Sequence, residues 1–255
     1  MATFACLALM KHDLLRLVGF PPEANDWISQ AITRSWPDGI WSSKPRPRCF
    51  EFKLGGSPWV PNGRSTVHSR YLILEILIVL KRHGYTLHSS SDISNSQYTR
   101  DTLVFRHGIA DESPTMFAIS TNSSDLLRLL RAPTELQPVM EQLIARHWPA
   151  GLQRKTLDYV PGCAEFKFSG YPWSFNGDDS IDARIFLLHL FAKLEELGWF
   201  LYGSIGQTSN GEGYAKDTWF FHYIAPNAVP LAVPLQKNVG YPMAPASAPE
   251  YLKYQ

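Results

Sequence analysis

The sequence predicts an α+β fold built from two tandem repeats, each a four-stranded, mainly antiparallel sheet with two helices. Three observations support this prediction. Several short motifs occur twice in the same order, helix-like and strand-like periodicities occupy matching positions in the two copies, and a glycine follows each of the two long predicted helices. We expect a pseudo-twofold axis to relate the two repeats.

The duplication is visible in motifs that recur at a nearly constant spacing. WPDG at 36–39 returns as WPAG at 148–151, an offset of 112 residues (148 − 36), and DLLRL at 13–17 returns with the same offset. EFK at 51–53 returns 114 residues later, and DT at 101–102 returns 116 residues later. Because the offset grows so little, the two copies differ by short loop insertions.

These offsets set the expected organisation of the chain. Residues 1–111 form the first repeat, residues 112–228 the second, and residues 229–255 a proline-rich tail. Within the tail, PLAVP at 230–234 lies where a partial third copy of the first strand would fall. Its prolines would confine such a strand to a sheet edge.

A strand and then a helix are expected to open each repeat. The strands lie at about 3–9 and 115–121, and apolar residues then recur with helical spacing. These helical positions are Trp27, Ile28, Ala31, Ile32 and Trp36 in the first repeat, and Val139, Met140, Leu143, Ile144 and Trp148 in the second.

A second strand follows, in which FEFKL at 50–54 alternates apolar with charged side chains, the period of a half-buried strand. A Gly-x-Pro-Trp turn ends this strand, because proline cannot continue a central ladder. We expect the tryptophans of the two turns, Trp59 and Trp173, to be buried against the long helix that follows.

The long helices are expected at about 65–83 and 179–197, and Gly84 and Gly198 end them. In the first repeat, strands at about 85–91 and 101–107 then form a hairpin. Both long helices carry broad apolar runs, so we expect the repeat's own sheet and the other repeat to cover each of them.

The motifs WPxG[IL], EFK[LF]xGxPW, DTxxF and DLLRL resemble those of a tandem-repeat family of uncharacterised eukaryotic proteins. The resemblance covers nearly the whole chain and implies the repeat architecture. It carries over no activity, cofactor or functional residue. The two copies differ at one position of this pattern, where the second repeat has His222 and the first has Arg106.

Composition limits the classes of function. Lys and Arg total 24 against 23 Asp and Glu, so no strong field would attract nucleic acid or an anionic membrane. The opening apolar stretch is shorter than the roughly 18 residues that span a bilayer, and no basic segment precedes it. Three cysteines without paired spacing predict neither a disulfide framework nor a zinc site. We therefore expect a cytoplasmic protein with no cofactor or metal that binds neither nucleic acid nor membrane.

Glu75 and His189 are the candidate catalytic residues. They occupy equivalent positions in the two long helices (189 − 75 = 114), and His68 and Asp182 stand seven residues before them. Seven residues are nearly two helical turns, so each pair lies along one helix face. If these faces met across a twofold axis, Glu75 and His189 would form a general acid–base pair. The alternative is that the stripe is the solvated side of an amphipathic helix.

The candidate ligand-binding residues recur in both copies. Arg70 and Arg184 lie in the first two turns of the long helices, where a guanidinium group could hold a carboxylate or another anion. Alternatively, each arginine pairs with an acid of its own repeat, such as Asp101 or Asp217. The remaining candidates are His68 and Asp182, together with the hairpin-loop residues Tyr98 and Tyr214.

The sequence contains no glycine-rich phosphate loop, HExxH, GxSxG or ligand-spaced histidine cluster. We therefore expect a non-catalytic module that holds a small, largely apolar ligand or a protein partner in the cleft between the repeats. The alternative is a cofactor-independent enzyme that uses Glu75 and His189 on a small, largely apolar molecule in the same cleft. The sequence does not determine the oligomeric state.

Overall fold

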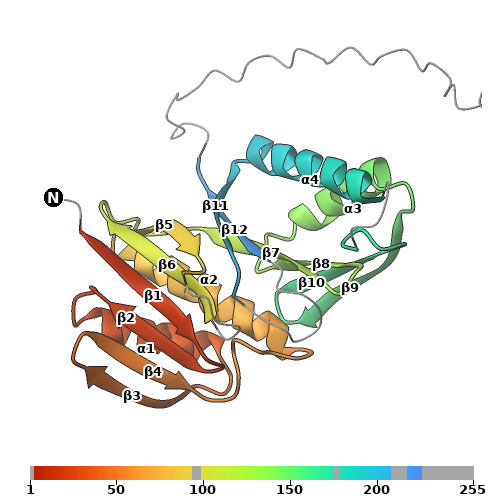
Figure 1. The fold of residues 1–255 in the computed structure, drawn as a ribbon. Helices are drawn as coiled ribbons and strands as arrows, with labels where there is room; N and C mark the ends of the chain where they lie inside the picture. Colours follow the sequence, from red (N-terminus) through yellow and green to blue (C-terminus); the bar gives the residue numbers. More distant parts are fainter. Residues whose placement is uncertain (1–2, 94–98, 175–178, 208–216, 226–255) are drawn as a thin grey trace, which may run out of the picture. The chain divides into compact units, whose positions relative to one another are not determined.

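The computed structural model describes residues 3–93, 99–174, 179–207 and 217–225, and Figure 1 shows its helices and strands. The predicted α+β duplication is confirmed, because the same elements follow one another twice. The first repeat comprises β1 (Phe4–Met10), β2 (Leu14–Val18), α1 (Ala24–Ser35), β3 (Ile40–Arg46), β4 (Cys49–Leu54), α2 (Ser65–Arg82), β5 (Tyr85–Ser91) and β6 (Thr99–His107). The second comprises β7 (Met116–Asn122), β8 (Leu126–Leu130), α3 (Leu136–His147), β9 (Leu152–Val160), β10 (Cys163–Phe168), α4 (Asp179–Glu196), β11 (Trp199–Ile205) and β12 (Thr218–Tyr223).

Within the described residues each repeat has a six-stranded sheet, so the prediction of four strands was wrong. Sheet 1 has the order β3-β4-β2-β1-β6-β5, and sheet 2 has the same order, β9-β10-β8-β7-β12-β11, when read from the equivalent edge. The extra strands are β2 and β3 and their counterparts β8 and β9. The DLLRL segment forms a central strand, because β2 pairs antiparallel with both β1 and β4. The segment 230–234, which could supply a further strand, lies outside the described residues.

Tryptophan side chains fix the connections to the sheets in the same way in both repeats. The Trp36 Nε1 donates to the Gly55 carbonyl at 2.8 Å, and the Trp59 Nε1 donates to the Leu14 carbonyl at 2.9 Å. Trp148 and Trp173 make the equivalent bonds, to Ser169 at 2.8 Å and to Leu126 at 2.9 Å. The predicted burial of Trp59 and Trp173 is confirmed.

The long helices end where predicted. Gly84 and Gly198 follow α2 and α4 with φ values of 81° and 83°, in the left-handed region that favours glycine. At Gly84 a Cβ atom would lie 2.6 Å from the Gly108 carbonyl oxygen, so a larger residue would also collide with the start of the inter-repeat connection.

Two hydrophobic cores show how the layers are stacked. The first core lies on the α1 and α2 side of sheet 1 and includes Met116, Ala118, Leu130 and Phe220 from sheet 2. The second core lies between the other face of sheet 2 and helices α3 and α4. Sheet 2 is therefore buried on both faces, and α2 lies between the two sheets.

The prediction of a pseudo-twofold relation was wrong. A twofold axis would make α4 pack on sheet 1 as α2 packs on sheet 2. Instead Val67, Tyr71 and Leu74 of α2 are buried, whereas Ile181, Ile185 and Leu188, 114 residues later (181 − 67), are exposed. The repeats are therefore joined head to tail, with the helix layer of the first against the sheet of the second. The prediction that the second repeat's long helix is covered on most sides fails for the same reason.

Candidate functional site

Among the described residues, packed side chains join the two repeats in the region where the sequence predicted a ligand cleft. Val67 and Leu74 of α2 are fully buried in the same core as Ala118 and Leu130 of sheet 2. The Tyr71 hydroxyl donates to the Pro161 carbonyl at 2.9 Å across this interface, and burial raises the pKa of that hydroxyl. These contacts join the two repeats within the described part of the chain.

The candidate catalytic pair is separated. Glu75 forms ion pairs with Arg131 of the second repeat at 2.8 Å and with Arg34 of α1 at 3.6 Å. His189 is exposed on α4, and its ring stacks on that of His147 with 3.7 Å between ring centroids. The partners of Glu75 and those of His189 are therefore different, and the two side chains do not pair with each other.

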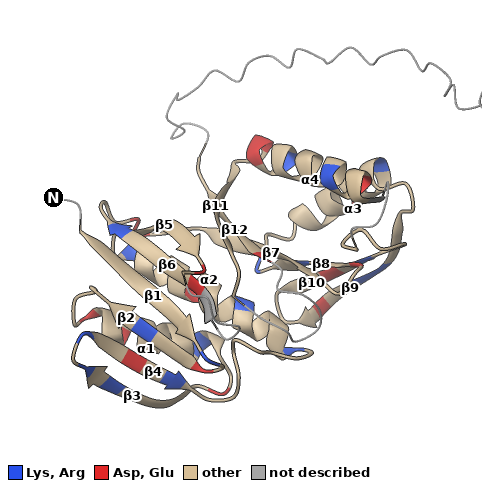
Figure 2. Cartoon of the chain, in the orientation of Figure 1, with Lys and Arg blue, Asp and Glu red and all other residues tan. Residues whose placement is uncertain are grey.

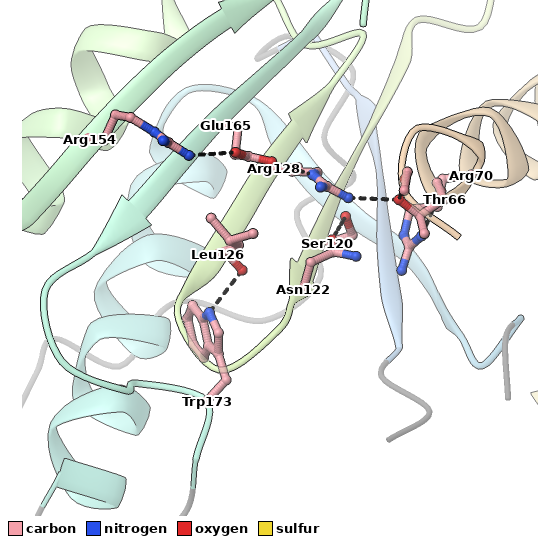
Figure 3. Close-up of polar contacts among 10 residues, drawn as sticks. Thr66, Arg70, Ser120, Asn122, Leu126, Arg128, Arg154, Glu165 and Trp173 are labelled. Atoms are coloured by element: carbon pink, nitrogen blue, oxygen red, sulfur yellow. Dashed lines mark hydrogen bonds and ion pairs between the residues drawn. The ribbon is translucent and has the colours of Figure 1, made fainter. Parts of the chain in front are cut away.

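Arg70 lies in a buried polar network that links α2 to sheet 2 (Figure 3). The Arg70 Nη1 donates to the Thr66 carbonyl at 2.6 Å, and the Arg128 Nη1 donates to the Thr66 hydroxyl at 2.8 Å. The Arg128 Nε donates to Glu165 at 2.9 Å, while Arg154 reaches the other oxygen of Glu165 at 3.8 Å. The predicted pairing of Arg70 with Asp101 is wrong, since Asp101 accepts instead from Ser90 and from the Gly206 amide.

The network holds two guanidinium groups close together. Burial lowers the pKa of Arg70 to about 10, and the neighbouring positive charge of Arg128 acts in the same direction. Arg70 therefore remains charged at neutral pH.

Three buried polar atoms have no hydrogen-bond partner within the described part of the chain: the Arg70 Nε, the Gln207 Oε1 and the Thr218 Oγ1. One contact of the network, from the Arg128 Nη1 to the Thr66 hydroxyl, joins the two repeats and helps to orient one on the other.

The other predicted ligand-binding residues do not form one site. His68 is half-buried on α2 beside the Tyr71 ring, and burial lowers its pKa although Asp38 acts against this shift. Asp182 is half-buried and Arg184 is exposed on α4, where the Arg184 Nη1 donates to the Ser180 carbonyl at 2.6 Å. Tyr98 and Tyr214 lie outside the described residues.

Side chains of α1 line a depression of about 250 Å³. Its lining residues are Ser29, Gln30, Thr33 and Arg34, all from one helix, and Arg34 also approaches Glu75. Among the described residues, no cluster of three or more His, Cys, Asp or Glu side chains could hold a metal ion. In the same part of the chain, no helix is long and apolar enough to cross a membrane.

The exposed side of α4 is the surface that sequence reasoning missed. Ile181, Ile185 and Leu188 are spaced by four and three residues, so they form one stripe, the open helix face. All three are exposed, and Leu188 retains 69% of its accessible surface. A contiguous apolar stripe of this kind is typical of a surface that another protein covers. The comparison with buried α2, rather than any motif, identifies it.

The sequence also did not predict the environment of His222 on β12. Its ring lies 5.4 Å from that of Tyr202, beside the ion pair of Lys81 and Asp111. Burial, with a smaller contribution from the charge of Lys81, lowers the pKa of His222 to about 4, while Asp111 opposes the shift. The imidazole is therefore neutral in the folded chain at pH values where it would be charged after unfolding.

This shift predicts a pH-dependent stability. Because the folded pKa lies below the unfolded value of about 6.5, the contribution of His222 is complete above about pH 6.5 and is lost as the pH falls toward about 4. We expect urea unfolding of the His222→Phe variant to show a shallower loss of stability over this range than the parent chain. Parallel pH profiles for the two proteins would contradict the assignment.

One comparison with known proteins supports the repeat architecture. A domain-family model matches the chain twice, over residues 3–106 and 115–222, which confirms the tandem-repeat part of the resemblance. Among solved structures, the chain is similar to the crystal structure of a conserved kinetoplastid-specific protein from Trypanosoma cruzi. The sequence identity is 19% and the TM-score 0.33, over 42% of this chain and 98% of that chain. The comparison with curated proteins finds no match.

Proposed function

This chain belongs to the domain family whose model matches both of its repeats, and from that premise we propose that it is a non-catalytic interaction module that binds a protein on α4. The observation that carries the proposal is the different fate of two equivalent helix faces. In the first repeat the face of α2 is covered by a sheet, and in the second the side chains of the open helix face, Ile181, Ile185 and Leu188, are exposed.

The physical argument is the hydrophobic effect. Each fully covered aliphatic side chain contributes about 1.5–3 kcal/mol relative to the exposed state, so three of them on one stripe favour association. Their spacing suits a flat or gently twisted apolar surface, the kind that already covers α2. The counterparts of these residues, Val67, Tyr71 and Leu74, show that this helix position can be buried by a sheet in this fold.

The cellular setting that we propose is the cytoplasm. Cys6, Cys49 and Cys163 are all free thiols, which fits a reducing compartment. The near balance of acidic and basic residues supports a protein partner rather than nucleic acid or an anionic membrane.

Site-specific photo-crosslinking tests this function. The full chain would carry p-benzoylphenylalanine in place of Leu188 in the cells that make the protein, and mass spectrometry would identify any adduct. Ile109, which is 95% exposed in the connection between the repeats, is the matched control position. We expect a protein adduct from position 188 and none from position 109. Equal labelling from both positions, or none from either, would rule out the open helix face as a docking surface.

A further inference from the structure

We propose that the partner on the open helix face is a second copy of this chain, which docks through the outward face of its sheet 1. This inference rests on the proposed function and names its partner. The interface between the two repeats serves as the template, because it already joins the same helix position to the same sheet face.

Sheet 1 leaves uncovered the face that sheet 2 buries against α2. Val18 on β2 is 38% exposed, whereas its counterpart Leu130 (130 − 18 = 112) is fully buried. Phe4 is exposed where Met116 is buried. We call this the open sheet face; it includes Phe4, Cys6, Ala8, Arg16 and Val18, and the exposed Arg106 lies opposite Phe4 on the neighbouring strand. It therefore combines apolar and charged side chains, and it is equivalent in place to the surface that covers α2.

The polar contacts at the centre of the template are present on both open surfaces. The Arg16 Nε donates to Glu51 at 2.8 Å, as the Arg128 Nε donates to Glu165 at 2.9 Å. Figure 2 shows acidic and basic positions side by side on the strands of this sheet, including β4. The pair that meets Thr66 inside the chain is thus repeated on the open sheet face.

The helix side of this contact is repeated as well. Ser180 replaces Thr66 at the equivalent position (180 − 66 = 114) and keeps a hydroxyl. The Arg184 Nη1 bonds the Ser180 carbonyl at 2.6 Å, as the Arg70 Nη1 bonds the Thr66 carbonyl at 2.6 Å. A second copy would therefore place its Arg16 guanidinium where it can donate to the Ser180 hydroxyl.

Several contacts of the template are missing, which lowers the strength of the association. Ile185 replaces Tyr71 and has no hydroxyl to reach a carbonyl, and His189 replaces Glu75, so the ion pair with Arg131 has no equivalent. The contact between copies is therefore weaker than the contact within the chain, and it is reversible. It is also heterologous, since the two surfaces differ, so copies join head to tail rather than as a closed symmetric pair.

Sedimentation velocity of the purified full chain over a wide concentration range tests the proposal. We expect the mean sedimentation coefficient to rise with concentration. Leu188→Glu on the helix face and Val18→Glu on the sheet face should each weaken self-association at least about tenfold, because either places a carboxylate in the contact. Ile109→Glu adds the same charge away from both surfaces and should change nothing. Circular dichroism and the thermal midpoint check that each variant is folded.

Mixing the two single variants gives the sharpest result. Leu188→Glu keeps an intact sheet face and Val18→Glu keeps an intact helix face, so an equimolar mixture should form dimers and stop there. Association abolished by Leu188→Glu but unaffected by Val18→Glu would show that α4 pairs with itself, and the proposal would be overturned. A chain that stays monomeric at every concentration would also overturn it.

The crosslinking experiment separates this inference from the proposed function. An adduct from position 188 to a second copy supports both. An adduct to a different protein upholds the docking function and overturns self-association. An adduct within a single chain, for example to residues 226–255, overturns both.

Discussion

Replacing Trp59 by Ala is expected to lower the free energy of unfolding by about 3–5 kcal/mol, the usual cost of deleting a large buried aromatic side chain. Trp59 is fully buried, and its indole Nε1 bonds the Leu14 carbonyl at 2.9 Å. Its backbone amide also donates to the His12 carbonyl at 3.1 Å. The side chain thus anchors the Gly-x-Pro-Trp turn to the start of β2, and its removal leaves both a cavity and an unpaired carbonyl.

Chemical denaturation of the full chain measures this effect, and Trp41 is the control. Trp41 lies on β3 and is 76% exposed, so Trp41→Ala should change the stability by less than about 0.5 kcal/mol. A loss below about 1 kcal/mol for Trp59→Ala would mean that the turn does not depend on this anchor.

The duplication, both long helices and the tryptophan anchors could be predicted from the sequence because each depends on local pattern. Two strands could not. DLLRL at 13–17 is short and nearly continuously apolar, so its periodicity does not separate a strand from the approach to a helix. The segment of β3 contains Pro45 between basic residues and resembles a surface loop. It is tolerated as a strand because β3 is at the edge of its sheet.

The surface that we propose as the site could not be predicted, because no short sequence pattern shows which repeat packs against which face of the other. The stripe Ile181, Ile185 and Leu188 is as apolar as its buried counterpart on α2, yet only the latter is covered. Likewise every residue of β7 is buried, whereas β1 alternates between buried and more exposed residues, although both strands begin with an apolar run. A sequence signal did exist for the polar network. Arginine in DLLRL and glutamate in EFK recur in both copies, and they face each other across paired strands.

Arg128→Ala is expected to cost about 3–5 kcal/mol of stability, because it leaves a buried carboxylate without its nearest cation. The Arg128 and Glu165 side chains are 4% and 5% exposed, and the remaining cation, Arg154, is 3.8 Å from the carboxylate. The substitution also removes the hydrogen bond to Thr66 and the cation–π contact with the Tyr159 ring, which lies 4.9 Å away.

Arg16→Ala is the matched control, since it deletes the same residue of the same motif from the first repeat. The Arg16 side chain is 34% exposed, and Glu51 keeps a second partner, Arg46, at 2.9 Å. Partly solvated ion pairs contribute little, so we expect a loss of about 0–1 kcal/mol. Both variants are measured by urea unfolding of the full chain at neutral pH.

A further variant distinguishes the contribution of the ion pair itself from the effect of burying it. The double variant Arg128→Leu with Glu165→Leu removes both charges, and we expect it to recover much of the stability that Arg128→Ala loses, because no unpaired charge remains buried. Equal losses for Arg16→Ala and Arg128→Ala would contradict the head-to-tail packing itself. Only that packing covers one pair with α2 and leaves the equivalent pair on an open sheet face. If the copies do associate through that face, the loss for Arg16→Ala should grow with protein concentration, whereas the loss for Arg128→Ala should not.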